Sequence, residues 1–108
     1  MVIKTNLKKS IKRFCQELAC EGYPIEKVIL FGSFVRNQRE AQDVDLAFVS
    51  AKFGQDRMAE LMLLKGLATS YKEPLDPIPL NAYDFNDRYS TLITEIKKKG
   101  RVLSGILT

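Results

Sequence analysis

The chain has 108 residues, of which 17 are basic and 13 acidic, and its net charge is +4. This length predicts one domain, residues 1–108, with a single core and no separate substrate-binding half. Histidine is absent from the sequence, which excludes histidine-based triads and histidine-containing zinc sites, and the charge excess is too small to indicate nucleic-acid binding.

The first predicted element is a helix near the start of the chain. Its apolar residues recur at helical spacing, at Leu7, Ile11, Phe14, Cys15, Leu18 and Ala19. They predict a helix that packs on a sheet, with Thr5 or Asn6 as its cap and Gly22 as its stop.

The cysteines and the lack of long apolar runs indicate the compartment. Cys15 and Cys20 would be separated by about 7.5 Å of helical rise, too far for a disulfide, so both are expected to be reduced packing residues. The longest apolar run, residues 61–64, is too short for a membrane span, and no signal peptide is predicted. A cytoplasmic location is therefore expected.

A strand, a turn and a short helix follow. Apolar residues predict a strand over Ile25–Phe31, and the helix begins at Ser33 and ends at about Arg39. A helix that begins there would direct free backbone N–H groups toward a phosphate. Gly32 leaves room for a triphosphate, Ser33 can donate a hydrogen bond, and Arg36 is either a phosphate contact or a surface salt bridge.

Two aspartates stand at the start of the next predicted strand, residues 43–50. Asp43 and Asp45 are two positions apart, so both carboxylates should face the same side of the sheet. Two hard oxygen ligands on one rigid strand suit Mg²⁺. The alternative interpretation is a helix cap at Ser33 followed by a solvated acidic turn.

A second long helix is predicted from Asp56 to about Tyr71. Its broad apolar face is expected to consist of Met58, Leu61, Met62, Leu64 and Ala68. Leu63 and Leu67 extend the apolar surface beyond one stripe, which predicts that part of it contacts another chain.

The segment Leu75–Leu80 predicts an edge strand. Pro77 and Pro79 have the same parity and would turn their missing hydrogen-bond donors to one side. An edge position beside the strand of Asp45 would bring Asp76 to the proposed metal site. The alternative is an ordinary aspartate in a proline turn.

The last helix is predicted to begin after Asp84 or Asn86. Its apolar residues are Tyr89, Leu92, Ile93 and Ile96. The order of elements predicts an α/β fold with a small mixed β-sheet packed with helices.

These motifs resemble those of a known family. Gly32-Ser33, a spacer and then Asp43-Val44-Asp45 resemble the signature of the minimal nucleotidyltransferases, small members of the polymerase-β-like superfamily. Asn37 stands where that family usually has Gly, and Gln42 stands where a Ser often precedes the first aspartate.

The resemblance extends to the later part of the chain. Residues 75–80 are similar to the family's third acidic strand, and residues 93–103 to its terminal helix and final short strand. The resemblance implies a polymerase-β-like core with Asp43, Asp45 and Asp76 as ligands of one or two Mg²⁺ ions.

The same resemblance implies roles for the other site residues. Gly32, Ser33 and Arg36 would bind the phosphates of ATP. Asp76 would also orient or deprotonate an incoming hydroxyl.

The resemblance also implies a partner. Small stand-alone members of this family resemble antitoxins that silence HEPN-domain ribonuclease toxins by transferring AMP to a tyrosine. The leading hypothesis is therefore AMPylation of a HEPN-type toxin. The alternatives are a non-catalytic antitoxin that acts by contact, and nucleotidyl transfer to a small molecule or to RNA.

Overall fold

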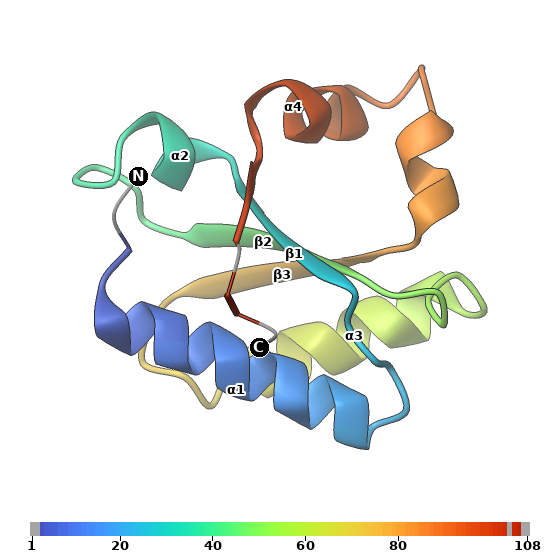
Figure 1. Ribbon diagram of the computed structural model, residues 1–108, viewed down its shortest axis with the longest axis horizontal. Coiled ribbons are helices and arrows are strands. Elements are labelled where there is room, and N and C mark those ends of the chain that lie inside the picture. The colour runs from blue at the N-terminus through green and yellow to red at the C-terminus, as the bar shows by residue number, and fades with distance from the viewer. Residues whose placement is uncertain (1–2, 104, 107–108) are drawn as a thin grey trace.

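The computed structural model describes residues 3–103 and 105–106 and contains a mixed four-stranded sheet (Figure 1). Its strands are β1 (Lys27–Phe31), β2 (Val44–Val49), β3 (Leu75–Leu80) and β4 (Arg101–Val102), in the order β3-β2-β1-β4. β1 pairs antiparallel with β2 and β4, whereas β2 and β3 are parallel. The predicted small mixed sheet is thereby confirmed, and β3 is an edge strand, as its prolines indicated.

The helices cover the two faces of the sheet unequally. α1 (Thr5–Cys20) and α3 (Arg57–Ala68) lie on one face, and the shorter α4 (Thr91–Lys99) lies on the other (Figure 1). α2 (Ser33–Arg36) lies in the connection between β1 and β2, and the 3-10 helix η1 (Ala82–Asn86) lies between β3 and α4. Within residues 3–103, no helix is both long and apolar enough to cross a membrane.

The main core lies between the sheet and the pair α1 and α3. Its most deeply buried side chains are Ile11, Phe14, Leu18, Leu30, Leu46, Phe48 and Leu64. A smaller core beneath α4 contains Ile29, Phe31, Ala47, Val49, Leu80, Ile93 and Ile96. Alternate residues of β1 and β2 thus enter different cores, as the two-residue period of a strand requires.

The start of α1 differs from the sequence prediction. Thr5 is already inside the helix, so Lys4 flanks it, and Lys4 provides no side-chain cap. The expected capping by Thr5 or Asn6 is therefore wrong.

Cys15 is buried as predicted, but Cys20 is exposed and the packing role expected for it is wrong.

α3 is rotated relative to the predicted apolar face. The Glu60 carboxylate turns inward and accepts hydrogen bonds from the backbone N–H groups of Gly54, Gln55 and Asp56, at 2.9, 3.1 and 3.3 Å. This arrangement leaves Met58 and Met62 about two-thirds exposed. Both were expected in the apolar face that packs on the core, and that expectation is wrong.

The same rotation changes the expected partner surface. Leu63 and Leu67 are half-buried and pack against the main core. They therefore serve the interior of this chain, and their assignment to surplus apolar surface is wrong.

The predicted last helix is two separate elements. Asn81 and Asp84 form a capping box at the start of η1. α4 starts later, where the Ser90 hydroxyl accepts from the backbone N–H of Ile93 at 3.2 Å. The cap is Ser90 and not Asp84 or Asn86, and Tyr89 lies outside the helix with 94% of its surface exposed.

Candidate active site

The turn between β1 and α2 brings a glycine against a carboxylate. Gly32 has φ 76° and ψ −153°, a conformation that is open essentially to glycine alone. A Cβ atom at this position would lie 2.0 Å from Oδ2 of Asp45. The turn therefore requires glycine for two reasons, its backbone conformation and the space that the carboxylate needs.

α2 is shorter than the sequence predicted, because it ends at Arg36 and not at about Arg39. A single turn has a much weaker dipole than a full helix, so the contribution expected from aligned peptide dipoles is correspondingly smaller. The predicted phosphate contacts at Ser33 and Arg36 must therefore come mainly from individual backbone and side-chain groups.

The strand register places three site residues side by side. Phe31 at the end of β1 pairs with Asp45, and Asp45 pairs with Asp76 on β3. The Asp76 carboxyl group is close enough to raise the pKa of Asp45. Asp76 thus lies beside Asp45 in a strand and not in a proline turn.

Asp43 lies just before β2, which begins at Val44, and is exposed. The predicted strand at residues 43–50 is therefore one residue too long at each end. The charge of Asp43 still acts on Asp45, because it is one of the causes of a raised pKa there.

The electrostatics of the site are dominated by crowded acidic groups. The pKa of Asp45 rises to about 6, first because of burial and then because of the hydrogen bond to Asp76 and the charge of Asp76. The negative charges of Asp43 and Glu95 raise this pKa further. Such a group takes up a proton or attracts a cation more readily than an ordinary carboxylate does.

Asp45, Asp76 and Glu95 line a cavity of about 370 Å³, which we call the carboxylate pocket. Its lining residues are Phe31, Gly32, Ser33, Arg36, Asp45, Asp76, Ile78, Leu92 and Glu95. It combines apolar walls with convergent polar groups, a combination typical of small-molecule sites. Five of the six residues predicted for the site line it, and Asp43 does not.

Two side chains that the sequence analysis missed complete the charge pattern. Glu95 on α4 forms an ion pair with Arg36, with Nη1 and Oε1 2.9 Å apart. Lys65 on α3 forms an ion pair with Asp76. Neither residue belongs to a motif, because each reaches the site from a separate helix that only the fold brings close.

The donor set fits Mg²⁺ in chemistry. Within residues 3–103 and 105–106, however, no group of three or more Asp, Glu, Cys or His side chains is arranged to hold a metal ion. Magnesium sites in phosphate-transferring proteins commonly use one or two carboxylates together with substrate phosphates and water. Asp45, crowded by Asp76 and Asp43, matches that pattern, and the predicted three-carboxylate ligand set stays a prediction.

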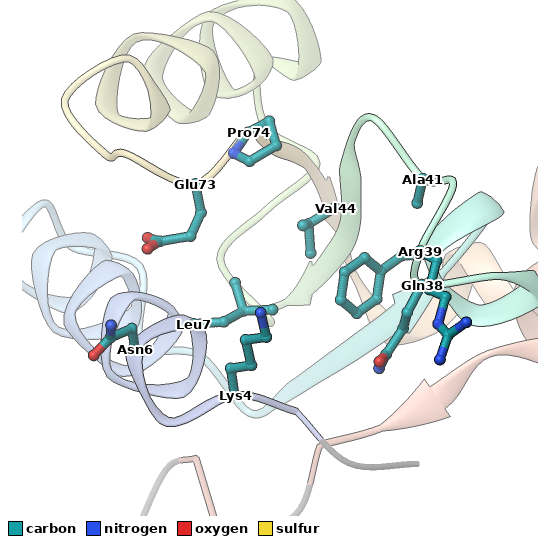
Figure 2. Close-up of a pocket in the computed structure, with 10 residues that line it drawn as sticks. Lys4, Asn6, Leu7, Gln38, Arg39, Ala41, Val44, Glu73 and Pro74 are labelled. Carbon is teal, nitrogen blue, oxygen red and sulfur yellow. The ribbon is translucent and has the colours of Figure 1, made fainter.

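A second cavity lies on the opposite side of β2 from the carboxylate pocket. It measures about 620 Å³ and is bounded by the start of α1, residues 38–41 of the α2–β2 loop, and Glu73-Pro74 before β3 (Figure 2). Val44 lines this cavity, whereas the next residue, Asp45, lines the carboxylate pocket. The start of β2 therefore separates the two cavities.

Comparisons with known proteins identify the fold. No curated protein sequence matches the chain. Among solved structures, a chain in a mutant form of the toxin–antitoxin complex MntA-HpeT has a TM-score of 0.60 and 19% identity, over 89% of this chain and 70% of that chain. A tri-AMPylated Shewanella oneidensis HEPN toxin in complex with MNT antitoxin contains a chain with a TM-score of 0.54 and 20% identity, over 88% and 70%.

A third structure, of a toxin–antitoxin with AMP-PNP, gives a TM-score of 0.56 and 19% identity over 84% of this chain and 70% of that chain. At these identities, the likeness concerns the fold. The model of the family described as polymerase beta, nucleotidyltransferase, matches residues 9–105. The chain belongs to the polymerase-β nucleotidyltransferase family.

Proposed function

We propose that this protein is a cytoplasmic, Mg²⁺-dependent adenylyltransferase that transfers AMP from ATP to a hydroxyl of a HEPN-type ribonuclease toxin, and so acts as an antitoxin. The observation that carries the proposal is the juxtaposition of Asp45 and Asp76 beside Gly32 in the carboxylate pocket. The fold likeness to MNT antitoxins solved with HEPN toxins supports the choice of partner, and the AMP-PNP complex supports the choice of nucleotide.

The nucleotide is held by the turn after β1. Gly32 leaves the backbone open to close approach, and the Ser33 hydroxyl donates to a phosphate oxygen. Arg36 leaves its ion pair with Glu95 and binds a phosphate of the nucleotide, so its guanidinium group keeps an anionic partner. Leu92 and Ile78 provide apolar wall against which the rest of the nucleotide packs.

The carboxylates divide the remaining work. Asp43 and Asp45 would hold Mg²⁺, which would supply Lewis-acid stabilisation of the negative charge that develops on the phosphates during transfer. Asp76 orients the acceptor hydroxyl and accepts its proton at a carboxylate oxygen. The hydroxyl oxygen then bonds to the α-phosphorus as the bond to the β-phosphate breaks, and pyrophosphate leaves.

The test combines calorimetry with mass spectrometry. Calorimetry measures ATP binding with and without Mg²⁺ for the wild type and for Asp43→Asn/Asp45→Asn. Mass spectrometry measures the mass of a co-purifying HEPN protein after incubation with ATP and Mg²⁺. We expect the wild type to show a Mg²⁺-dependent binding component and to add the mass of AMP to its partner. The double variant should lose both, with a drop in transfer rate of at least about 100-fold.

Glu21→Gln/Glu26→Gln is the matched control, because it removes the same charge from exposed positions before β1, at the opposite end of that strand from Gly32. Equal Mg²⁺-dependent binding in the wild type and Asp43→Asn/Asp45→Asn would refute the site. Silencing of the partner without any gain in its mass would refute transfer and favour action by contact. Efficient AMP transfer to a small molecule by the isolated protein would refute the protein acceptor.

A further inference from the structure

Asp76 has two partners, and they come from opposite faces of the sheet. It is the register partner of Asp45, whose pKa it raises, on the face that α4 covers, and it forms an ion pair with Lys65 of α3. α3 covers the other face (Figure 1). Because β3 is the edge strand, the Lys65 side chain reaches the carboxylate around the outer edge of β3.

The fold allows the Lys65 side chain to contact Asp76. Leu64 is fully buried and fixes the last turns of α3 against the core, which leaves Lys65 on the flank of the helix. β3 has a strand neighbour on one side only, so its other edge is open to a long side chain. The Lys65 and Asp76 side chains keep 49% and 40% of their surface exposed, which leaves the pair free to separate.

The charges of the pocket are divided unevenly among its acidic groups. Glu95 is paired with Arg36, and Asp76 is paired with Lys65. Within residues 3–103, neither Asp43 nor Asp45 has a cationic side chain at ion-pair distance. Glu95 and Asp76 therefore already have cationic partners, whereas Asp43 and Asp45 do not.

We propose that Lys65 competes with a divalent cation for Asp76, so that the nucleotide-free protein binds one divalent cation, at the Asp43/Asp45 side of the site. Lys65 acts as a positioning residue for Asp76 and keeps that carboxylate available for the acceptor hydroxyl. The inference rests on the proposed function, because it specifies how many cations the same site accepts.

Manganese binding to the nucleotide-free protein tests this inference by electron paramagnetic resonance, which counts free Mn²⁺ directly. Wild type should bind one Mn²⁺. Lys65→Met should bind a second Mn²⁺, or the first about 3- to 10-fold more tightly, because the Asp76 carboxylate loses its ion-pair partner and becomes available as a ligand. Lys65→Arg should resemble wild type, since it keeps the charge.

Two controls separate this effect from a change in net charge or folding. Lys52→Met removes the same charge from an exposed turn beyond the far end of β2 and should leave Mn²⁺ binding unchanged. In an Asp76→Asn background, Lys65→Met should have no effect on Mn²⁺ binding. The variants should fold, because a partly exposed ion pair contributes little to stability.

The outcomes distinguish the inference from the proposed function. If Lys65→Met binds Mn²⁺ with wild-type stoichiometry and affinity, or if Lys52→Met shows the same gain, the competition is refuted while the site stands. If no variant binds Mn²⁺, the inference and the proposed metal site both fail.

Discussion

Alternate residues of β2 contribute to the two faces of the sheet, and the two faces have different roles. On the face toward α1 and α3, Val44, Leu46 and Phe48 are buried among apolar side chains. On the face toward α4, Ala47 and Val49 are buried, but Asp45 reaches the open carboxylate pocket. α4 is shorter than α1 or α3 and lines the pocket at Leu92 and Glu95 without filling it.

The difference shows how one small fold separates stability from chemistry. The face toward α1 and α3, which we call the closed face, supplies most of the apolar burial, the dominant favourable contribution to folding, and its cavity of about 620 Å³ lies at one end of β2. The open face holds mutually repelling carboxylates, which cost stability until a cation arrives. Changes on the closed face should therefore act on folding, and changes on the open face should act on the site.

The largest effect is expected on the closed face. Phe48 is fully buried and stacks on Phe14, with ring centroids 4.8 Å apart. Phe48→Ala should lower the free energy of unfolding by about 3–5 kcal/mol, through lost burial and the cavity left behind. Urea unfolding measures this change, with the exposed Met62→Ala as a control that should shift it by less than about 0.5 kcal/mol. A loss below about 1 kcal/mol for Phe48→Ala would contradict this account of the core.

A smaller effect on stability, with a larger effect on binding, is expected at the turn. Gly32→Ala would place Cβ 2.0 Å from Asp45 Oδ2 and force an unfavourable backbone conformation. We expect a loss of about 1–3 kcal/mol in unfolding free energy and loss of the Mg²⁺-dependent part of ATP binding. Calorimetry and thermal unfolding report the two effects separately.

Gly66→Ala is the matched control for this variant, because nothing lies within 4 Å of the added Cβ in α3. It should raise stability by about 0.5–1 kcal/mol, since alanine favours a helix. If Gly32→Ala binds ATP with Mg²⁺ as wild type does, the close approach of Gly32 and Asp45 has no role in binding.

The smallest expected change in unfolding free energy is at Asp45, on the face toward α4, and there the substitution should stabilise the protein. The pKa of Asp45 is about 6 in the folded chain and near its ordinary value of 3.8 when unfolded. Between these two pH values, the folded state binds more protons than the unfolded state, so stability falls as pH rises. Asp45→Asn escapes this loss and should be more stable than wild type at pH 7, without metal, by about 1 kcal/mol after allowance for solvent screening.

Thermal unfolding with a chelator present measures this difference as a rise in Tm of about 4 °C or more. The gap between the two proteins should narrow as the pH falls from 6 and close at about pH 3, below the unfolded pKa, where Asp45 is protonated in both states. Added Mg²⁺ should stabilise wild type and leave Asp45→Asn unchanged. A variant that is less stable than wild type at both pH values would contradict the repulsion among the carboxylates.

Much of the framework was predictable because it depends on local patterns. The apolar periods predicted the helices and strands, and the parity of Pro77 and Pro79 predicted the edge strand. The errors arose where one side chain overrode the pattern. Glu60 turned α3 by capping the preceding loop, and Ser90 delayed the start of α4. Both are single hydrogen-bonding groups whose partners a hydrophobic period does not reveal.

The sequence by itself determined the family motif, Gly32-Ser33 and Asp43-Val44-Asp45, because residues close together in the chain keep their spacing in any strand and turn. Only the tertiary structure decided which charges meet there. Lys65 and Glu95 arrive from helices on opposite faces, and Asp76 joins Asp45 through the parallel register of β2 and β3. Such contacts depend on how the helices pack against the sheet and on which strand lies at its edge. The whole core determines this packing and strand order, and no local segment does so alone.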